Sequence, residues 1–413
     1  MKILWLCNIE LPCISKALGH NINPLGGWMV SIFDLLIRVP GLELCVCFPT
    51  RTNKLFDGSD GKVRYYSFKL FKDSIMRFED ILVEAKPDII HIFGTEFRHS
   101  LDMIKACEKK KLINQTIVSI QGLIHLIGKH YYSDIPSKVI HKYSFHDFIR
   151  HSNIYWAKKK YEKRGKYEIE VICRVKHIIG RTEWDYAVTK QINSSVNYHF
   201  CNETLRTSFY NQKWKFDECE KYSIFISQAN YPIKGLHILL EALSVVKDKY
   251  PCVHLYVAGK NFASKEIKSA IMKTGYDKYI YNYIKQKNLS ENISFLGTLE
   301  ENEMLDRYMK SNVFVICSSI ENSPNSLGEA MILGVPSIAS DVGGIRSMFR
   351  DRIDGYIYPF NESYMLAYYI CKIFDNIDDA CKMSENAKKH AMQLYDKTNN
   401  LNKLLSIYRD LLV

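Results

Sequence analysis

The sequence predicts an α/β protein of two domains, each built around a parallel β-sheet. Short apolar runs alternate with longer helical stretches along the whole chain. The runs are continuous rather than alternating, which is typical of strands that helices cover on both faces. A chain of 413 residues is also too long for one ordinary core. We therefore expect two domains of roughly 200 residues each.

The expected strands form two series, separated by a polar, aromatic-rich stretch with no clear period. We place the two domains at residues 1–205 and 206–385, and we expect a final helix over residues 386–413 to pack back on the first domain. The first series of strands is residues 2–7, 42–48, 88–93, 116–120 and 177–180, and the second is 222–227, 253–259, 293–297, 313–319 and 336–340.

Composition excludes several classes of protein. The 47% hydrophobic and 24% charged residues are those of a folded globular protein. No stretch reaches the roughly 18 uninterrupted apolar residues that a membrane span needs. The 12 cysteines are spread through apolar runs and include no C-x-x-C pair. We therefore expect free buried thiols, no zinc site and a reducing, cytoplasmic compartment.

The formal net charge of +11 at pH 7 favours binding to an anionic partner. The densest basic patch lies beside Tyr155 and Trp156 and suits an anionic lipid surface, so a cytoplasmic protein peripheral to the inner face of the plasma membrane is expected. A solvated helix face is the alternative. Nucleic acid is disfavoured, because the chain has no zinc-finger spacing, RNA-binding aromatic motif or basic heptads. The patch consists of Lys158, Lys159, Lys160, Lys163, Arg164 and Lys166.

Two glutamates, Glu321 and Glu329, flank the start of an expected helix that follows the strand over residues 313–319. Unpaired backbone N–H groups around Asn325, Ser326 and Leu327 suit a phosphate or diphosphate. Glu329, expected in the first turn, is a bidentate acceptor for paired ribose hydroxyls, and Glu321 on the loop can take sugar hydroxyls. The alternative needs no ligand, because Ser326 and Glu329 have the spacing of a capping box.

The spacing E-x7-E from Glu321 to Glu329 is followed by EAMILGVPSIASDVGG, and other short motifs precede and follow it in order. They are PLGGW, KPDIIHIFG, IIGRTEWD, YPIKGLH, LYVAG, ISFLG and DGYIYP. Together these motifs resemble the retaining glycosyltransferases of the GT-B fold, specifically family 4, over nearly the whole chain. The resemblance implies two Rossmann-like domains whose parallel sheets face each other across a cleft.

The resemblance also implies roles for individual residues. Glu329 matches the acid that holds the nucleotide ribose, and Glu321 matches the acid near the donor sugar. Backbone amides around Asn325 and Ser326 face the sugar and diphosphate. Lys234 matches the lysine that neutralises the leaving diphosphate, where a preorganised cation stabilises the charge that develops in the transition state.

Two glycines near the N-terminus fit the same pattern. Gly26 and Gly27 precede a helical stretch and look like the tight turn by which the backbone approaches the diphosphate in this family. An ordinary flexible loop start is the alternative.

The sequence departs from the family at the diphosphate cation. The family has arginine ahead of the lysine, whereas this chain has Ser227 and Gln228. Either another cation such as Arg181 helps Lys234, or diphosphate binding is weaker.

A second departure concerns the acceptor side. Phe93 stands where many relatives have a histidine, and we expect His91 to be a packed histidine. Glu96 and Gln121, on the loops after two expected strands, are our catalytic candidates near the acceptor or the anomeric carbon. A glutamine can donate hydrogen bonds but cannot act as a general base.

The expected function is transfer of a sugar, with retention, from a nucleotide-diphosphate sugar to a saccharide or lipid-linked saccharide, as in bacterial surface polysaccharide biosynthesis. In the resembled family the leaving phosphate is commonly proposed as the base. No D-x-D motif occurs, so we expect no metal, and no cofactor beyond the nucleotide sugar.

Two alternatives stay open. A nucleotide-sugar 2-epimerase would share the fold but needs acid and base residues in the cleft. A catalytically degenerate scaffold subunit would explain Gln228, Phe93 and Gln121. The sequence specifies neither the base and sugar of the donor nor the acceptor linkage and oligomeric state.

Overall fold

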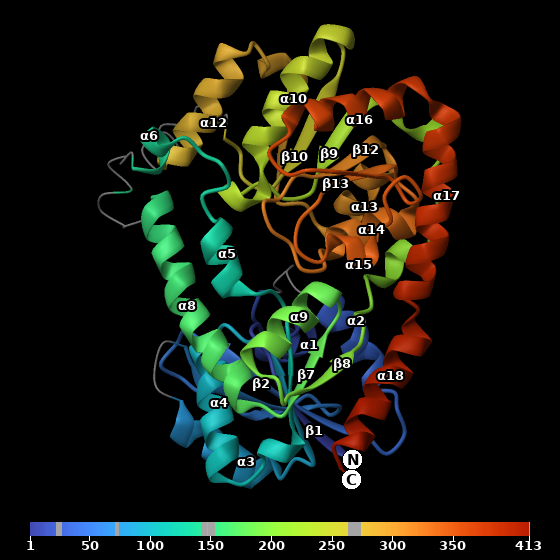
Figure 1. Ribbon diagram of the computed structural model, residues 1–413. Coiled ribbons are helices and arrows are strands. Elements are labelled where there is room, and N and C mark those ends of the chain that lie inside the picture. Colours follow the sequence, from blue (N-terminus) through green and yellow to red (C-terminus); the bar gives the residue numbers. More distant parts are fainter. Residues whose placement is uncertain (22–26, 71–73, 142–146, 148–152, 263–273, 413) are drawn as a thin grey trace. The chain divides into compact units, whose positions relative to one another are not determined.

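The computed structural model describes residues 1–21, 27–70, 74–141, 147, 153–262 and 274–412 (Figure 1). The chain divides into two compact units, each with its own sheet and hydrophobic core. This confirms the expected α/β class with two parallel-sheet domains. Unit 1 comprises Met1–His125, Lys163–Arg206 and Tyr395–Val413, and unit 2 comprises Leu126–Glu162 and Thr207–Leu394.

Unit 1 is built on an eight-stranded sheet in the order β3-β4-β2-β1-β5-β6-β7-β8. Its strands pair in parallel except β3, which is antiparallel to β4. Ile3 lies opposite Leu44 on one side and Ile89 on the other. The strands are β1 (Lys2–Leu6), β2 (Glu43–Thr50), β3 (Gly58–Ser59), β4 (Arg64–Lys69), β5 (Ile89–Phe93), β6 (Thr116–Ser119), β7 (His177–Gly180) and β8 (Asn197–Phe200).

Strands β3, β4 and β8 were not among the expected strands. β4 reads RYYSFK and β8 reads NYHF, so polar residues interrupt the apolar run that identifies a buried strand. β3 and β8 lie at the two edges of the sheet, where one side of a strand has no neighbour in the sheet and less of it needs to be apolar.

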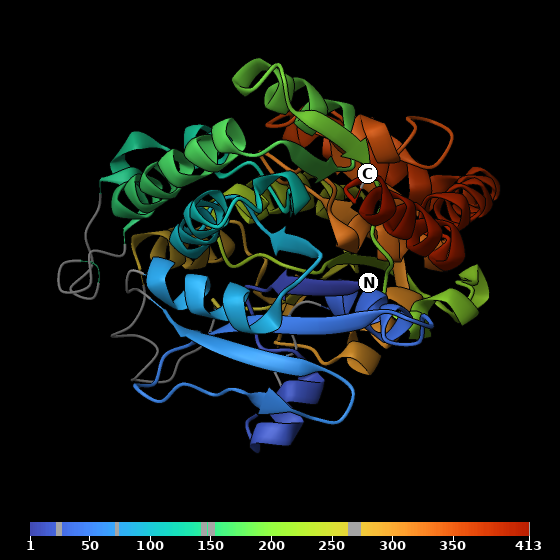
Figure 2. The same ribbon diagram turned by 90° about the horizontal axis from the view of Figure 1, so that it is seen from below.

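Helices flank this sheet on both faces (Figure 1 and Figure 2). Their apolar side chains, together with those of the strands, make the core of unit 1. The helices of this unit are α1 (Pro12–Leu18), α2 (Gly27–Leu36), α3 (Ile75–Ala85), α4 (Arg98–Lys109), α9 (Glu183–Ile192) and α18 (Lys397–Asp410), while α5 (Ile124–His130) and α8 (Ile154–Arg174) each continue between the two units.

Two helices, α17 (Ile377–Leu394) and α18, replace the single helix expected over residues 386–413. The helix breaks because Asp396 accepts a hydrogen bond from the backbone N–H of Asn399 at 2.7 Å and so caps a new helix. α17 belongs to unit 2 and α18 to unit 1. Tyr408 of α18 is fully buried in unit 1, where its hydroxyl contacts Trp5 Nε1 at 3.2 Å and His91 Nδ1 at 2.6 Å.

Unit 2 is built on a six-stranded, fully parallel sheet in the order β11-β10-β9-β12-β13-β14. The strands are β9 (Glu220–Ile226), β10 (His254–Ala258), β11 (Ile293–Gly297), β12 (Ser311–Ile316), β13 (Ser337–Ser340) and β14 (Tyr356–Tyr358). The helices that belong to this unit alone are α6 (Ser137–Ile140), α10 (Leu236–Lys249), α12 (Gly275–Gln286), α13 (Glu301–Met309), α14 (Asn325–Leu333), α15 (Ile345–Met348), α16 (Ser363–Asp375) and α17.

Residues 126–162 group with unit 2, whereas the boundaries expected from the sequence put them in the first domain. The reason is packing, because apolar side chains of this segment bury themselves in the unit 2 core. The backbone carbonyl of Ser133 also contacts Nε2 of His237, in α10, at 2.6 Å. The buried side chains are Tyr131, Ile135, Val139, Ile140 and Ile154.

All 12 cysteines are free, as expected. Cys173 and Cys252 are exposed rather than buried, because Cys173 lies on an exposed position of α8 and Cys252 lies in the turn before β10. Within the described ranges, no helix combines the length and the hydropathy needed to cross a membrane.

Candidate functional site

The strand order of unit 2 reverses between β9 and β12, so that the chain leaves these neighbouring strands toward opposite sides of the sheet. In open parallel sheets the crevice at the carboxyl ends of such a strand pair is where ligands bind. The loop after β9 carries Lys234, and the loop after β12 carries Glu321. The structure therefore brings together two of the residues singled out in the sequence.

Lys234 and Glu321 form a half-buried ion pair. Lys234 Nζ donates to Glu321 Oε1 at 2.5 Å, and the Ser318 hydroxyl donates to the same oxygen at 2.7 Å. The side chains of the lysine and the glutamate are 21% and 13% exposed. The ammonium and carboxylate groups are thus in direct contact and remain partly exposed to solvent.

Main-chain contacts tie the two loops together. The N–H of Ser319 donates to the carbonyl of Ile233 at 2.8 Å, and Cys317 Sγ lies 3.2 Å from the carbonyl of Lys234. Gly235 has φ 70°, and a Cβ there would stand 1.7 Å from the Cys317 carbonyl oxygen. Only glycine allows this approach, which explains the glycine that follows the lysine.

The loop after β13 holds Glu321 from the other side. The N–H of Gly344 donates to the Glu321 carbonyl at 3.0 Å, and a Cβ at Gly343 would lie 2.0 Å from that oxygen. The Ser340 hydroxyl donates to the Ser318 carbonyl at 2.6 Å. Gly343 of the DVGG motif is therefore needed for close packing under the acid.

Glu329 lies in α14 with 5% of its surface exposed. It is the fifth residue of the helix, in the second turn, and not in the first turn as expected. The capping-box alternative is wrong: α14 begins at Asn325 after Pro324, so Ser326 is already inside the helix and cannot be its N-cap. The N–H of Leu327 is bonded to the Pro324 carbonyl at 3.0 Å, so it is not the open donor that the sequence predicted.

The position of the family arginine remains without a cation. Gln228 is exposed and Ser227 is half-buried. Arg181, the suggested substitute, belongs to unit 1 and pairs there with Glu203, with Nη1 2.5 Å from Oε1. Its Nη2 donates to the carbonyls of Ile120 at 3.3 Å and Gln121 at 3.5 Å. The charge of Arg181 is therefore balanced within unit 1.

The strand order of unit 1 reverses between β1 and β5, and Glu96 lies on the loop after β5. Its side chain is buried, and Arg164 Nη2 donates to Oε1 at 3.2 Å. Burial raises the pKa of Glu96 to about 7, although Arg164 opposes the shift. The Arg164 guanidinium also lies 5.0 Å from the ring centre of Phe97. Arg164 is thus part of this loop's support and not a free surface cation.

Sequence reasoning missed Glu168, which is fully buried in α8 and organises the loops after β5 and β6. One oxygen accepts from Thr95 Oγ1 at 3.0 Å and from the N–H of Ile124 at 2.9 Å. The other accepts from the N–H of His125 at 2.9 Å and contacts its ring Nδ1 at 2.5 Å. The sequence carried no signal for it, because Glu162 and Glu170 are acids of the same helix.

His91 is a packed histidine, as expected from the sequence. It is 1% exposed, and its Nε2 contacts the Ser119 hydroxyl at 2.7 Å while its Nδ1 meets Tyr408. Burial lowers its pKa to about 3, so the ring is neutral. Gly26 lies outside the described residues, and Gly27 begins α2.

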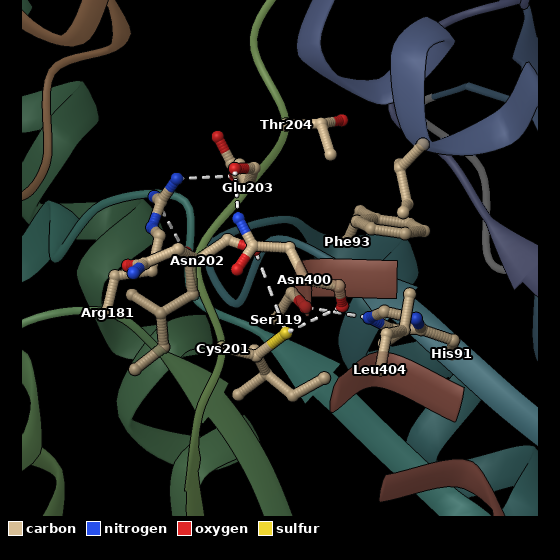
Figure 3. Close-up of a pocket in the computed structure, with 13 residues that line it drawn as sticks. His91, Phe93, Ser119, Arg181, Cys201, Asn202, Glu203, Thr204, Asn400 and Leu404 are labelled. Atoms are coloured by element: carbon tan, nitrogen blue, oxygen red, sulfur yellow. Dashed lines mark hydrogen bonds and ion pairs between the residues drawn. The ribbon is translucent and has the colours of Figure 1, made fainter. Parts of the chain in front are cut away.

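A cavity of about 40 Å³ lies at the carboxyl edge of unit 1 (Figure 3). Strands β5, β6 and β7 and helices α2 and α18 contribute residues to its walls, together with residues 201–204, which follow β8. The sequence carried no motif for residues 201–204, because they lie in the polar stretch without clear period.

The basic patch of residues 158–166 lies in α8. Lys159 donates to Glu162 at 2.9 Å and Lys158 lies 4.3 Å from the ring centre of Tyr132. The exposed members of the patch are Lys159, Lys160, Lys163 and Lys166. In the part of the chain that the structure describes, no three His, Cys, Asp or Glu side chains gather in a way that could hold a metal ion.

Residues 207–390 match the family model described as glycosyl transferases group 1. Among curated proteins, a putative glycosyltransferase of Bacillus subtilis, YtcC, is 24% identical over 208 residues, which is 49% of this chain and 48% of that protein. The UDP-Gal:alpha-D-GlcNAc-diphosphoundecaprenol alpha-1,3-galactosyltransferase of Escherichia coli is 26% identical over 137 residues, covering 32% and 34%. The chain thus spans about half or less of the length of these relatives.

Solved structures match over the whole chain. Sucrose-phosphate synthase from Thermosynechococcus elongatus has a TM-score of 0.70 at 14% identity, covering 100% of this chain and 99% of that one. Anabaena Alr3699/HepE in complex with UDP-glucose has a TM-score of 0.69 at 15% identity, covering 99% and 100%. These likenesses show the GT-B fold, and the family match supports the group 1 glycosyltransferase superfamily.

Proposed function

We propose that this protein is a retaining glycosyltransferase of the family 4 type. It transfers a sugar from a nucleotide-diphosphate sugar to a saccharide or lipid-linked saccharide acceptor, in bacterial surface polysaccharide biosynthesis. The observation that carries the proposal is the Lys234–Glu321 pair at the strand-order reversal of unit 2, inside the segment that matches group 1 glycosyltransferases.

Lys234 stabilises the leaving group. When the bond from the anomeric carbon to the diphosphate breaks, negative charge develops on the diphosphate oxygen, and the ammonium group now bonded to Glu321 is positioned to meet it. Because the lysine is already fixed by Glu321, little reorganisation is needed at the moment of reaction. The charge is met by Lys234 and backbone donors, so we propose turnover that persists in EDTA.

The two acids hold neutral parts of the donor. Glu321 accepts hydrogen bonds from hydroxyls of the donor sugar, while Glu329 accepts from the paired ribose hydroxyls. Asn325 and Ser326, at the start of α14, lie between the two acids along the chain and face the sugar and diphosphate.

Uracil is the base to test first. The Anabaena HepE structures hold UDP and UDP-glucose, and the name of the E. coli relative gives UDP-Gal as its donor and a diphosphoundecaprenol-linked saccharide as its acceptor. We extend both to this chain as proposals: a UDP-sugar donor bound by the domain of residues 206–385, and an acceptor bound by the domain of residues 1–205.

Glu96 and Gln121 are the proposed acceptor-side residues. They follow β5 and β6, which are neighbours in the unit 1 sheet, so their loops lie side by side at its carboxyl edge. The raised pKa of Glu96 lets it exchange a proton near neutral pH. The exposed lysines of α8 would hold the protein against an anionic membrane at its cytoplasmic face.

The test is calorimetric titration of UDP, GDP and ADP into the purified chain and into two variants of the ribose acid. Glu329→Gln keeps the volume of the side chain but loses the carboxylate, and Glu329→Ala loses both. We expect one nucleotide to bind to the wild type and both variants to lose that binding, with Glu329→Gln retaining the melting temperature.

Each alternative has its own outcome. If no nucleotide binds even at about millimolar concentration, the scaffold alternative replaces the proposal. If a UDP-sugar is converted with no acceptor present and the product remains a nucleotide sugar, the epimerase alternative replaces it. A matched control is Lys249→Met, which breaks the exposed Lys249–Asp375 pair (2.6 Å) of unit 2 and should leave nucleotide binding unchanged.

A further inference from the structure

Three buried polar atoms at the carboxyl edge of unit 1 have no hydrogen-bond partner among the described residues. They are Glu96 Oε2, Gln121 Nε2 and Arg181 Nε, on the loops after β5, β6 and β7. A fourth, Thr204 Oγ1, follows β8. Others lie within strands or helices, such as Tyr66 Oη in β4 and Thr189 Oγ1 in α9, whereas these four follow four successive strands of the sheet. Buried polar atoms without partners are rare and indicate a functional site or bound water.

Two of these atoms belong to residues that line the cavity shown in Figure 3. Phe93, Ile179 and Leu404 make apolar walls. A water molecule needs about 10–15 Å³ of such volume, so a cavity of about 40 Å³ holds roughly three waters or one hydroxymethyl group. A whole sugar ring does not fit. The polar side of the cavity consists of Arg181, Asn202, Glu203 and Thr204.

The charge of this polar side is balanced. Arg181 Nη1 lies 2.5 Å from Glu203 Oε1, and the two side chains are only 5% and 12% exposed. Asn400 Nδ2 donates to the Glu203 carbonyl at 3.0 Å, which fixes the rim to α18. A lone buried guanidinium would be a strong site for phosphate. With the Glu203 carboxylate beside it, a phosphate would meet repulsion in a poorly solvated place.

A hydroxyl group fits the same surroundings. It can accept a hydrogen bond from Arg181 Nε and donate one to the Thr204 hydroxyl or to Glu203, because a hydroxyl is both donor and acceptor. The apolar walls suit the carbon that carries it.

We propose that this cavity is a subsite for an uncharged, hydroxyl-bearing group of the acceptor, such as the hydroxymethyl group of a neutral saccharide. The Arg181–Glu203 pair is the selective element that excludes a phosphorylated group there. The assignment of this group to the acceptor rests on the proposed function. The subsite and its selectivity depend on residues of unit 1 alone.

The selectivity is tested with inorganic phosphate as the probe, in the full chain carrying Lys234→Ala so that the unit 2 lysine does not contribute. Glu203→Gln removes the repelling charge and leaves Arg181 alone. We expect it to bind phosphate about tenfold more tightly than its parent, and Arg181→Gln/Glu203→Gln to lose that gain. Equal phosphate affinity in the parent and in Glu203→Gln, both folded by circular dichroism, overturns the proposal.

The hydroxyl preference is tested with a second variant that keeps the shape of the cavity. Thr204→Val replaces a buried hydroxyl that lacks a partner in the described chain with a methyl group, so a purely structural role predicts an unchanged or raised melting temperature and no effect on ligands. The proposal predicts that methyl α-D-glucoside, followed by saturation-transfer NMR, binds about threefold more weakly. An unchanged affinity, or no binding of this neutral probe to the wild type, overturns it.

These experiments separate the two proposals. UDP binding, measured by calorimetry, reports on unit 2 and does not involve the cavity. A chain that binds UDP but shows no change in either probe refutes the subsite and keeps the glycosyltransferase. A chain that binds the neutral probe as predicted but no nucleotide keeps a saccharide subsite and refutes the transferase.

Discussion

The two sheets of this protein end in edges of opposite character. At the carboxyl edge of unit 2, Lys234 and Ser318 both donate to Glu321, and main-chain contacts that require glycine hold three loops together. At the carboxyl edge of unit 1, Glu96 and Gln121 each keep a buried polar atom without a partner among the described residues.

This difference matches two kinds of task. A site for an anionic leaving group benefits from a charge that is fixed before the substrate arrives. A site for hydroxyl groups needs donors and acceptors left open, because every internal bond removes one that the ligand could use. We therefore expect substitutions that move the backbone at the unit 2 edge to lower stability and nucleotide binding. At the unit 1 edge we expect the effects to come from removal of a polar group or from a change of pH.

The largest effect is expected from Gly235→Ala. The new Cβ would stand 1.7 Å from the Cys317 carbonyl at a backbone φ of 70°, so the loops after β9 and β12 must separate. We expect a loss of about 3 kcal/mol or more in the free energy of unfolding and loss of nucleotide binding. Chemical denaturation and calorimetry measure the two.

The matched control is Gly297→Ala. Gly297 has a similar φ of 75°, but a Cβ there would meet nothing within 4 Å. The variant should show only backbone strain, about 1–2 kcal/mol, and should bind nucleotide normally. Equal losses in the two variants would contradict the clamped geometry of the unit 2 edge.

Lys234→Met comes next. It removes the cation while keeping most of the side-chain length, and we expect kcat to fall about 10²–10³-fold, as for loss of one preorganised stabilising group. The control Lys249→Met breaks an exposed pair of similar length and should leave kcat unchanged. If the role of Lys234 is only to neutralise Glu321, then adding Glu321→Gln should restore activity. We expect no such rescue.

Glu96 gives a pH-dependent prediction. Burial raises its pKa to about 7 in the folded chain against an ordinary value of 4.5, so between these values the folded state binds the extra proton. This contribution to stability is present below about pH 4.5 and is lost as pH rises through about 7, with a total of up to about 3 kcal/mol. Glu96→Gln lacks this slope.

The measurement is the free energy of unfolding of both proteins at pH 5 and pH 8. Relative to the wild type, Glu96→Gln should gain stability as pH rises, and the acceptor-dependent rate of the wild type should titrate near pH 7. If the free energies of unfolding of the wild type and Glu96→Gln change equally with pH, the pKa of Glu96 is ordinary. Glu96 would then not exchange a proton near neutral pH.

The smallest effect is expected on the surface of α8. Lys160 and Lys163 are exposed, and removal of each should weaken partition onto phosphatidylserine vesicles about fivefold. Sugar transfer to a soluble acceptor should not change. Lys382 and Lys389, exposed on α17, serve as the control pair. Vesicle sedimentation that responds equally to both pairs would indicate net charge rather than a specific surface.

Prediction from the sequence succeeded where the signal was local. Lys234 and Glu321 were found because each lies in a short motif, and the structure brings them together. Glu168 and Glu203 were missed because their partners stand far away in the chain: the pair with Arg181 spans 22 residues and that with His125 spans 43. Sequence separations of 22 and 43 residues match neither the helix period nor the strand period, so no sequence pattern indicates these pairs.

The capping box shows the opposite error. Ser326 and Glu329 have the correct spacing for it, but the N-cap is Pro324, so the helix starts two positions too early for Ser326 to be the cap. Local patterns compete, and the backbone geometry of one residue decided this case.

By itself the sequence determined the α/β class, the position of most strands along the chain and the motifs that carry Lys234 and Glu321, because periodicity and glycine-bearing motifs are properties of neighbouring residues. Only the tertiary structure decided which strands are neighbours, that residues 126–162 pack in unit 2, and that Arg181 is neutralised by Glu203. The physical reason is that burial and charge pairing depend on distance in space, which chain folding sets and sequence separation does not.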